Sequence, residues 1–343
     1  MLVSLCTIVK NEEYWLPRMC ELYAPLADEM IVVDTGSTDG TLSTTHPKLH
    51  LLPSVRFTKD TPRADFHFGE ARNEAIEKAQ GDWILSIDAD YVIAEHEVAR
   101  LRCFIESEEA KQWDVVNFIV DSGTTRVSQP LLTRRSCGIR YYGSCHEMMR
   151  IPHGARRLAE SAIRFTHVRT DAAEGIKAYT EKRLHYIDLI RKAIEREPSD
   201  YREQYNLALE YCQLKRYDEV LRVTSEVLQN SNGYELHPKY VALLMWLRGI
   251  ALFNTGDYRG GIGQVAMALR SDPDNVPATY MLAEMKRLTG DLDGAEPLFR
   301  KLITIEAPTG IFHRDYPEYR TAKAEEGLRL ITEARRVAVS ARG

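Results

Sequence analysis

An internal repeat constrains the C-terminal half of this chain most strongly. Two series of small or bulky apolar residues match at a constant offset of 34 residues: Gly249, Gly261, Val265 and Ala268, then Ala283, Ala295, Phe299 and Leu302. The turn sequence Gly256-Asp257-Tyr258 recurs at the same offset as Gly290-Asp291-Leu292. A fixed period of this length is typical of a two-helix unit that buries its apolar face only against neighbouring copies. We therefore expect an all-α array in this half.

A third copy of the pattern precedes the other two. It consists of Leu207-Ala208, Tyr211, Tyr217 and Val220, offset by 41 residues from the next copy, and the insertion is expected in Asn230–Pro238. Small residues where paired helices touch, a bulky apolar knob and a closing proline are tetratricopeptide-repeat positions. We expect residues 171–343 to form a helical domain with about three such repeats, with a generic helical bundle as the alternative.

Residues 1–170 have a different pattern, in which short apolar runs alternate with amphipathic stretches. Leu2–Val9, Met30–Asp34 and Trp83–Ile87 are typical of strands buried on both faces, and Trp15–Leu26 and Phe66–Ala79 are typical of helices. This alternation favours an α/β domain with a mostly parallel sheet. Four more strand-like segments follow without a long helix, which indicates a mixed sheet: Val115–Val120, Leu131–Arg135, Ile139–Tyr142 and Ala162–His167. We expect the polar segment Asp121–Pro130 between them to be a mobile loop.

The totals of the chain exclude several classes of protein. Its 343 residues carry a formal net charge of −5, so the whole molecule is not a generic polyanion binder. The six cysteines form no C-x-x-C pair, which gives no sign of a zinc knuckle or redox pair. No apolar run reaches the roughly 18–20 residues of a membrane span, and the N-terminus lacks a signal-peptide pattern. We expect a cytoplasmic protein without a membrane span.

The sequence Asp88-Ala89-Asp90 directly follows a predicted buried strand. Ligands of open α/β sheets bind where strands end. Two carboxylates one residue apart at such an edge suit a hard divalent cation, Mn²⁺ or Mg²⁺, that shares its shell with a diphosphate. An Asp-x-Asp motif alone is weak, because such acids often lie in ordinary polar loops.

Three further motifs accompany this one in a fixed order. They are Val9-Lys10-Asn11-Glu12-Glu13 after the first strand, Val32-Val33-Asp34-Thr35-Gly36-Ser37-Thr38-Asp39-Gly40-Thr41 around the second, and Gly69-Glu70-Ala71-Arg72-Asn73 in the following helix. Together with Gly81-Asp82-Trp83-Ile84-Leu85 before Asp88, this series resembles the inverting family 2 glycosyltransferases of the GT-A fold. It is most similar to the subgroup with a C-terminal tetratricopeptide region, and the resemblance covers nearly the whole chain.

The resemblance implies a nucleotide-sugar site, with a UDP-sugar favoured as donor. It implies that Thr7, Lys10 and Glu12 contact the nucleoside and that Asp34 accepts a hydrogen bond from a uracil-like imide. Arg72 would contact the nucleotide or its phosphates. Two structural alternatives stay open: Asp34 could cap the next helix, and Arg72 could be an ordinary surface residue.

The resemblance also assigns the metal. Asp88 and Ala89 would lie beside the ribose, with Asp88 near the cation and Asp90 as its direct ligand. Tyr91 stands where the family often has an acidic residue. His167 closes the last predicted strand, and a histidine there resembles the one that completes the metal or diphosphate site in many GT-A enzymes. The alternative for His167 is a structural role.

The catalytic base is expected at His146-Glu147, because inverting transfer needs a group that takes the proton of the acceptor. The subgroup has a similar His-Glu pair after its added strands, and we expect Glu147 to be the base. The alternative is a structural acid that accepts hydrogen bonds from nearby amides. The predicted site therefore depends on Asp34, Arg72, Asp90 and Glu147 converging on one crevice at one edge of the sheet.

The acceptor is less constrained by the sequence. Residues 131–170 hold two acids and eight arginines, a local charge of +6 that favours an anionic acceptor or a solvated basic face: Arg134, Arg135, Arg140, Arg150, Arg156, Arg157, Arg164 and Arg169. Tetratricopeptide arrays usually bind peptides, so a protein or peptide acceptor is expected first. A modified DNA base is the second expectation.

Other readings of the whole chain stay open. The helical domain could instead brace the catalytic domain or form a homodimer. A non-catalytic nucleotide-sugar-binding adaptor is an alternative to an enzyme. A nucleotidyltransferase is disfavoured, because Leu2–Glu13 contains no glycine for a phosphate loop.

Overall fold

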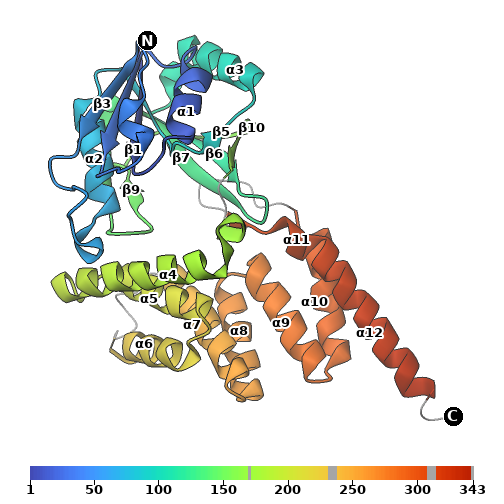
Figure 1. Cartoon of the computed structure of the whole chain (residues 1–343). Coiled ribbons are helices and arrows are strands. Elements are labelled where there is room, and N and C mark those ends of the chain that lie inside the picture. Colours follow the sequence, from blue (N-terminus) through green and yellow to red (C-terminus); the bar gives the residue numbers. More distant parts are fainter. Residues whose placement is uncertain (169–170, 231–237, 307–313, 341–343) are drawn as a thin grey trace. The chain divides into compact units, whose positions relative to one another are not determined.

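A computed structural model describes residues 1–168, 171–230, 238–306 and 314–340. It divides into two compact units, Met1–Lys177 with Pro308–Arg314 and Ala178–Ala307 with Asp315–Gly343 (Figure 1). The expected domain boundary after residue 170 stays a prediction. Thr170, Arg169 and the interior of the expected insertion Asn230–Pro238 lie outside the described residues.

The first unit is built on a mixed β-sheet. Within the described residues the sheet has nine strands, in the order β3-β2-β1-β4-β7-β6-β10-β5, and β11 (Arg314–Asp315) also pairs with β7. The main strands are β1 (Val3–Val9), β2 (Glu29–Asp34), β3 (Leu49–Pro53), β4 (Trp83–Ser86), β5 (Tyr91–Val92), β6 (Val115–Asp121), β7 (Arg126–Arg134) and β10 (Arg157–His167).

Strand direction divides this sheet into two halves. β3, β2, β1 and β4 are parallel. The apolar runs predicted β1, β2 and β4, whereas β3 was not among the expected strands. β7 is antiparallel to both β4 and β6, while β10 runs parallel to β6 and antiparallel to β5. The expected α/β architecture with an added mixed region is thus confirmed.

The segment Asp121–Pro130 is not the mobile loop that its polar composition suggested. Residues Arg126–Arg134 form β7, and β6 and β7 make a hairpin whose tip is closed by a hydrogen bond from the Ser122 amide to the Thr125 carbonyl at 2.9 Å. Cross-strand pairs reach the tip, where Asp121 lies opposite Arg126 and binds its side chain at 2.8 Å. The prediction failed because polar strands facing solvent have no apolar run to mark them.

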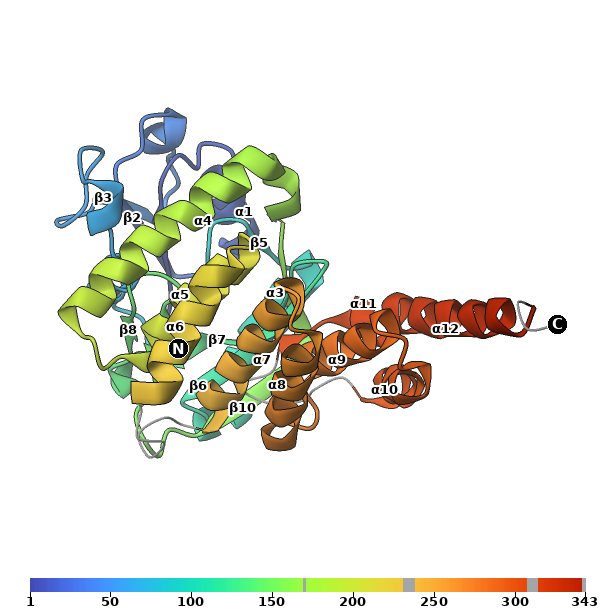
Figure 2. The same ribbon diagram turned by 90° about the horizontal axis from the view of Figure 1, so that it is seen from below.

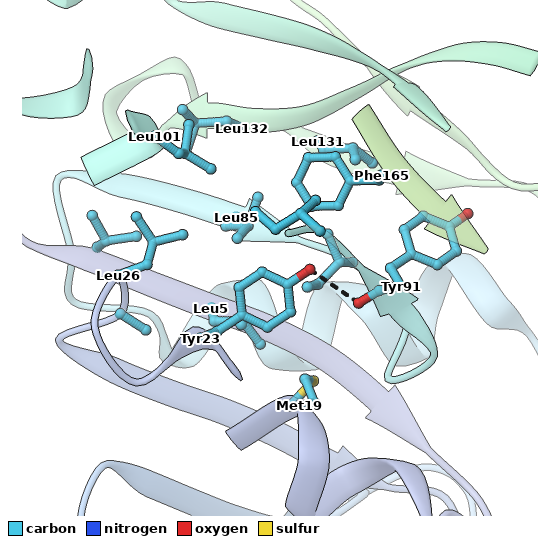
Figure 3. Close-up of a cluster of buried hydrophobic side chains, with 14 of the residues drawn as sticks. Leu5, Met19, Tyr23, Leu26, Leu85, Tyr91, Leu101, Leu131, Leu132 and Phe165 are labelled. Carbon is cyan, nitrogen blue, oxygen red and sulfur yellow. Dashed lines mark hydrogen bonds between the residues drawn. The ribbon is translucent and has the colours of Figure 1, made fainter. Parts of the chain in front are cut away.

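Helices cover both faces of the parallel half (Figure 1). On one face, α1 (Trp15–Tyr23) and α3 (Glu95–Glu106) pack on residues such as Leu5 and Leu85. On the other, α2 (Phe68–Lys78) packs on Cys6 and Ile84. Figure 3 shows the first of these cores, in which the buried Tyr23 hydroxyl donates to the Tyr91 carbonyl at 2.9 Å.

The second unit consists of helices, and the repeated residues lie where paired helices touch. Gly249 and Gly261 meet backbone to backbone, since a Cβ on Gly261 would lie 2.8 Å from the Gly249 carbonyl. Ala283 and Ala295 are both fully buried at the equivalent positions. The helices are α4 (Asp171–Arg196), α5 (Tyr201–Gln213), α6 (Tyr217–Asn230), α7 (Pro238–Asn254), α8 (Tyr258–Ser271), α9 (Val276–Leu288), α10 (Leu292–Thr304), α11 (Pro317–Arg320) and α12 (Ala322–Ser340) (Figure 2).

The turns inside the pairs explain the repeated Gly-Asp sequence. Gly256 and Gly290 have φ angles of 100° and 85°, a region that favours glycine. The following aspartates cap α8 and α10 by accepting the amides of Gly260 and Gly294. In the earlier copy, Lys215 takes this left-handed position with φ 57°. The helix pairs confirm the predicted tetratricopeptide-like domain.

The described helices also bear on membrane insertion. None of them combines the length and the apolar character that a bilayer crossing needs.

Candidate active site

The parallel strands bring three of the predicted motifs to one edge of the sheet. Val9 at the end of β1 pairs with Asp34 at the end of β2, and β4 ends beside them because Cys6 pairs with Ser86. Lys10 therefore follows β1, and Asp88 follows β4, at the same carboxyl edge. Ligands of open α/β sheets bind at such an edge.

The loops after β1 and β2 are fastened to one another. Asn11, with φ 60°, donates its amide to the Ser37 hydroxyl at 2.8 Å, and its side-chain oxygen accepts the Thr38 amide at 2.8 Å. The amide of Glu12 donates to the Thr41 hydroxyl at 2.7 Å. Asn11 belongs to a predicted motif, but the sequence alone indicated no role for it. These bonds hold Lys10 and Glu12 next to the loop that carries Asp34.

Asp34 is engaged with its own turn. Its side chain accepts the amides of Gly36 at 2.9 Å and Ser37 at 3.1 Å, and the residue is 6% exposed. Asp34 does not cap the next helix, because Asp39 is the capping residue there. It closes its own turn instead, and a carboxylate has acceptor sites beyond the two used here. Thr7 is 1% exposed within β1, so the structure does not bring this predicted nucleoside contact to the surface of the edge.

Arg72 on α2 joins two of the predicted acids. Its Nη2 donates to Asp88 Oδ1 and its Nε to Glu147 Oε1, both at 2.6 Å. The Arg72 side chain is 12% exposed, so it is not an ordinary surface residue. Burial alone would lower the pKa of Arg72, yet the negative charges of Asp88 and Glu147 raise it well above its ordinary value. The ion pairs unite one residue from each of three segments distant in the chain.

The first turn of α2 positions Arg72. The amides of Phe68 and Gly69 donate to the carbonyls of Ser144 and Gly143, at 3.0 and 3.3 Å. Gly69 permits this approach, because a Cβ there would lie 3.0 Å from the Gly143 carbonyl oxygen. The loop that leads to Glu147 therefore closes the N-terminus of the same helix that carries Arg72.

Asn73 completes this attachment. Its side-chain amide donates to the Tyr141 carbonyl and its oxygen accepts the Tyr141 amide, each at 2.9 Å. The Tyr141 hydroxyl donates to the Ser86 hydroxyl at 3.0 Å, and burial raises the pKa of Tyr141. Gly69 and Asn73 thus attach the helix that carries Arg72 to the hairpin beside Glu147, a role that was not assigned to them from the sequence. Their place beside Arg72 in one motif was the available signal.

Glu147 and His146 lie in the connection between two short strands, β8 (Arg140–Tyr142) and β9 (Met148–Arg150), which pair with one another. The Glu147 side chain is 15% exposed. His146 is half-buried and has a left-handed backbone with φ 47°. This conformation turns the chain between Cys145, which is buried, and Glu147.

The expected metal residues fall into two places. Asp90 Oδ2 lies 3.1 Å from His167 Nε2, because β5 pairs with the end of β10 and sets Tyr91 opposite His167. Asp88 instead binds Arg72, and Ala89 between the acids packs in the hydrophobic core at 5% exposure. Within the described residues, no group of three or more His, Cys, Asp and Glu side chains is arranged to hold a metal ion. One carboxylate oxygen and one imidazole nitrogen nevertheless suit a cation that completes its shell from substrate and water.

The basic segment divides between the two edges of the sheet. Arg134 pairs with Trp83 at the start of β4, opposite the end that Asp88 follows. Four of the eight arginines lie at that far edge with internal partners: Arg134 with the Trp113 carbonyl, Arg135 with the Gly81 carbonyl, Arg156 with Asp114, and Arg157 with Asn117. The charge of these four therefore does not lie near Asp88, because β7 runs antiparallel to β4 and β10 begins beside the start of β6.

The class of this domain is defined by its mixed α/β sheet, with acidic residues and Arg72 at the edge where the parallel strands end. Residues 4–160 match the family model described as Glycosyl transferase family 2, so the chain carries a glycosyltransferase domain of family 2, joined to tetratricopeptide-like helix pairs.

One curated relative is similar to part of the chain, and solved structures are similar to part or nearly all of it. A TPR repeat-containing protein of Synechococcus elongatus is 36% identical over 148 residues, which are 43% of this chain and 35% of the relative. The chain thus spans about a third of the length of the curated relative it matches. S. aureus TarS 1-349 has 15% identity over 98% of this chain and 92% of that chain, with a TM-score of 0.38. Glucosyl-3-phosphoglycerate synthase from Mycobacterium tuberculosis, in complex with Mn²⁺, UDP and glucosyl-3-phosphoglycerate, has 23% identity over 36% of this chain and 45% of that chain, with a TM-score of 0.29.

Proposed function

We propose that this protein is an inverting glycosyltransferase that moves a sugar from a nucleotide-diphosphate donor, with a UDP-sugar favoured, to a protein or peptide acceptor. The main support for the proposal is that Arg72 forms two ion pairs. Arg72 joins Asp88, beside the proposed donor site, to Glu147, the proposed base, at the edge where β1, β2 and β4 end. Family membership supports sugar transfer in general.

The donor's nucleoside is proposed to lie over the loops after β1 and β2. Lys10 and Glu12 would contact it, and Asp34 would use a remaining acceptor site for an imide N–H, which favours uracil. Thr7 is too deeply buried to support a direct contact and would act only through the strand. The backbone at Ala89 would border the ribose together with Asp88.

Asp90 and His167 would hold Mn²⁺ or Mg²⁺, with Asp88 at its border. When bound, such a cation neutralises negative charge on a leaving nucleoside diphosphate. The chain's own contribution is to place a carboxylate and an imidazole together at the end of β10. His167 fits this role as a neutral imidazole.

Glu147 would take the proton of the acceptor. As the acceptor atom forms its bond to the anomeric carbon, the bond from that carbon to the diphosphate oxygen breaks, and the electron pair leaves with the diphosphate. The acceptor's proton passes to a Glu147 carboxylate oxygen. Arg72 has further N–H groups beyond the two used here, so it can also face the diphosphate while it orients Glu147. His146 would shape the connection that presents the base.

The proposal is tested with a panel of nucleotide sugars and Mn²⁺, scored for donor hydrolysis and for the thermal shift of the full chain. Asp90→Ala and His167→Ala should lose the metal-dependent thermal shift. In the unmodified chain, metal at 100 times its Kd should raise the free energy of unfolding by about 2.7 kcal/mol. Glu147→Gln should keep that shift and lose transfer. Asp60→Ala, at an exposed acid, is the matched control.

Three outcomes would contradict parts of the proposal. Full transfer activity in both Asp90→Ala and Glu147→Gln would reject the site assignments. Binding of a nucleotide sugar without turnover under any condition would support the adaptor alternative. A mass gain on DNA, and none on peptides, would select the DNA acceptor.

A further inference from the structure

The hairpin formed by β8 and β9 has one face packed on the protein and one turned outward. In its ladder Tyr141 lies opposite Met149, and both pack against the core between α2 and the sheet. Side chains alternate across a strand, so the neighbouring pairs lie on the other face. Those pairs are Tyr142 with Met148, and Arg140 with Arg150.

Two arginines directly opposite one another are an unfavourable arrangement in a β ladder. Arg140 and Arg150 are both exposed. The nearest carboxylate of Arg140 is Glu77, at 3.8 Å. Arg150 lies 5.3 Å from the centre of the Tyr142 ring, and no carboxylate of the described residues is within ion-pair distance of it. The hairpin therefore presents two positive charges that its own fold only weakly balances.

The outward face of the hairpin lies close to the proposed catalytic base. Glu147 immediately precedes Met148, the first residue of β9. Three residues of strand span about 10 Å, so Arg150 lies within about that distance of the proposed base. An acceptor that reaches Glu147 and continues along the hairpin would place a group one to three residues away against Arg140 and Arg150.

We infer that the outward face of the β8–β9 hairpin binds an acidic side chain of a peptide acceptor, close in sequence to the residue that receives the sugar. The inference rests on the proposed function. A guanidinium matches a carboxylate in a bidentate fork, and Tyr142 and Met148 supply apolar contact for the adjoining peptide. DNA fits this face less well, because its row of phosphates demands many cations. Four of the other arginines of the segment are engaged at the far edge of the sheet.

Binding is measured first, without any donor. Two fluorescein-labelled peptide pools carry a central Ser, Thr or Asn, with either Glu or Gln at the three positions on each side. The full chain should bind the Glu pool at least tenfold more tightly by anisotropy. Arg140→Ala with Arg150→Ala should abolish that preference, while Arg100→Ala, at an exposed arginine of α3, should retain it. Equal binding of both pools by the unmodified chain, or an undiminished preference in the double variant, would overturn the inference.

A charge-reversal variant distinguishes a change in peptide preference from a loss of folding. Arg140→Glu with Arg150→Glu should shift the preference to a Lys-substituted pool. Arg150→Ala should unfold at the same temperature as the unmodified chain or higher, because it relieves repulsion, whereas a structural role would lower that temperature. A lowered unfolding temperature with no switch in preference contradicts the inference.

Donor hydrolysis separates this inference from the proposed function. Hydrolysis without acceptor should change less than twofold in the double alanine variant, while the KM for a Glu-pool acceptor should rise at least tenfold. Absence of hydrolysis and transfer in the unmodified chain rejects the proposed function. Transfer that occurs equally to Glu and Gln pools rejects only the acidic-acceptor inference.

Discussion

Asn73 and Tyr141 are joined by two reciprocal hydrogen bonds of 2.9 Å, from side-chain amide to backbone carbonyl and from backbone amide to side-chain oxygen. This pair fastens β8 to α2 one residue after Arg72. The position of Glu147 relative to Arg72 thus depends on an asparagine that touches neither of the expected substrates.

Asn73→Ala should leave both backbone groups of Tyr141 without these partners. We expect a loss of about 1–3 kcal/mol in the free energy of unfolding, measured by urea titration. Donor turnover should fall by up to about 100-fold, since small displacements of a catalytic group are costly. Asn73→Asp keeps an acceptor for the Tyr141 amide and should be intermediate.

Asn275→Ala is the matched control for this experiment. Asn275 caps α9 in the helical unit, where its side chain accepts the Ala278 amide at 3.0 Å. Its loss should cost about 1 kcal/mol of stability without affecting turnover. Equal effects of both variants on turnover would show that Asn73 acts through stability alone.

Arg72→Met should leave two carboxylates close together without their shared counter-charge. We expect the free energy of unfolding to fall by about 1–3 kcal/mol, because both groups lose charged hydrogen bonds. In a double-mutant cycle with Glu147→Gln, the two changes should be coupled by about 0.5–3 kcal/mol. Additive effects would mean that the ion pair contributes nothing to stability. Arg72→Lys should not rescue turnover, because an ammonium cannot reproduce the fork.

Gly69→Ala places a methyl group 3.0 Å from the Gly143 carbonyl and 3.2 Å from the Tyr142 nitrogen, so the hairpin must move away from α2. Turnover should fall and the unfolding temperature should drop. Gly263→Ala is the control, because a Cβ there meets nothing within 4 Å inside α8. That change should stabilise the protein by about 0.5–1 kcal/mol and leave turnover unchanged. A harmless Gly69→Ala would show that the close approach is not required.

Acid stability should depend on Asp114 at the far edge of the sheet. Hydrogen bonds from the Arg156 side chain and backbone hold the pKa of Asp114 below its ordinary value. A lowered pKa in the folded state means that the stabilisation is present above the unfolded pKa of about 3.9 and is lost as pH falls through the folded pKa. Asp114→Asn should therefore flatten the loss of stability below about pH 4, as followed by thermal unfolding in a pH series. An unchanged pH profile would contradict the assignment.

Local patterns predicted the elements of this fold well, because burial on both faces leaves a continuous apolar run such as Leu2–Val9, and paired helices leave small residues at a fixed offset. Polar strands were harder, and the first half of β7 was mistaken for a loop. The direction of β7 could not be inferred either, so the sequence did not show that Arg134 and Arg135 lie at the edge opposite Asp88.

In the candidate site, too, some features were predictable from the sequence and others were not. Strand ends located Asp34, Asp88 and Asp90 at one edge, since a strand and its following acid are contiguous in sequence. The partnership of Arg72 with Glu147 joins residues 75 positions apart, and no local pattern records such a pairing. The burial of Thr7 and the hydrogen bonds of Asp34 within its own turn likewise depend on packing and loop geometry around them.

Ala89 faces the core between two acids that have different partners, Arg72 for Asp88 and His167 for Asp90. The burial of Ala89 thus fixes a turn that directs the two neighbouring carboxylates to different partners. A larger side chain at this position would displace both acids from their partners. An uncharged substitution in the core could therefore abolish activity without contacting any ligand through its side chain.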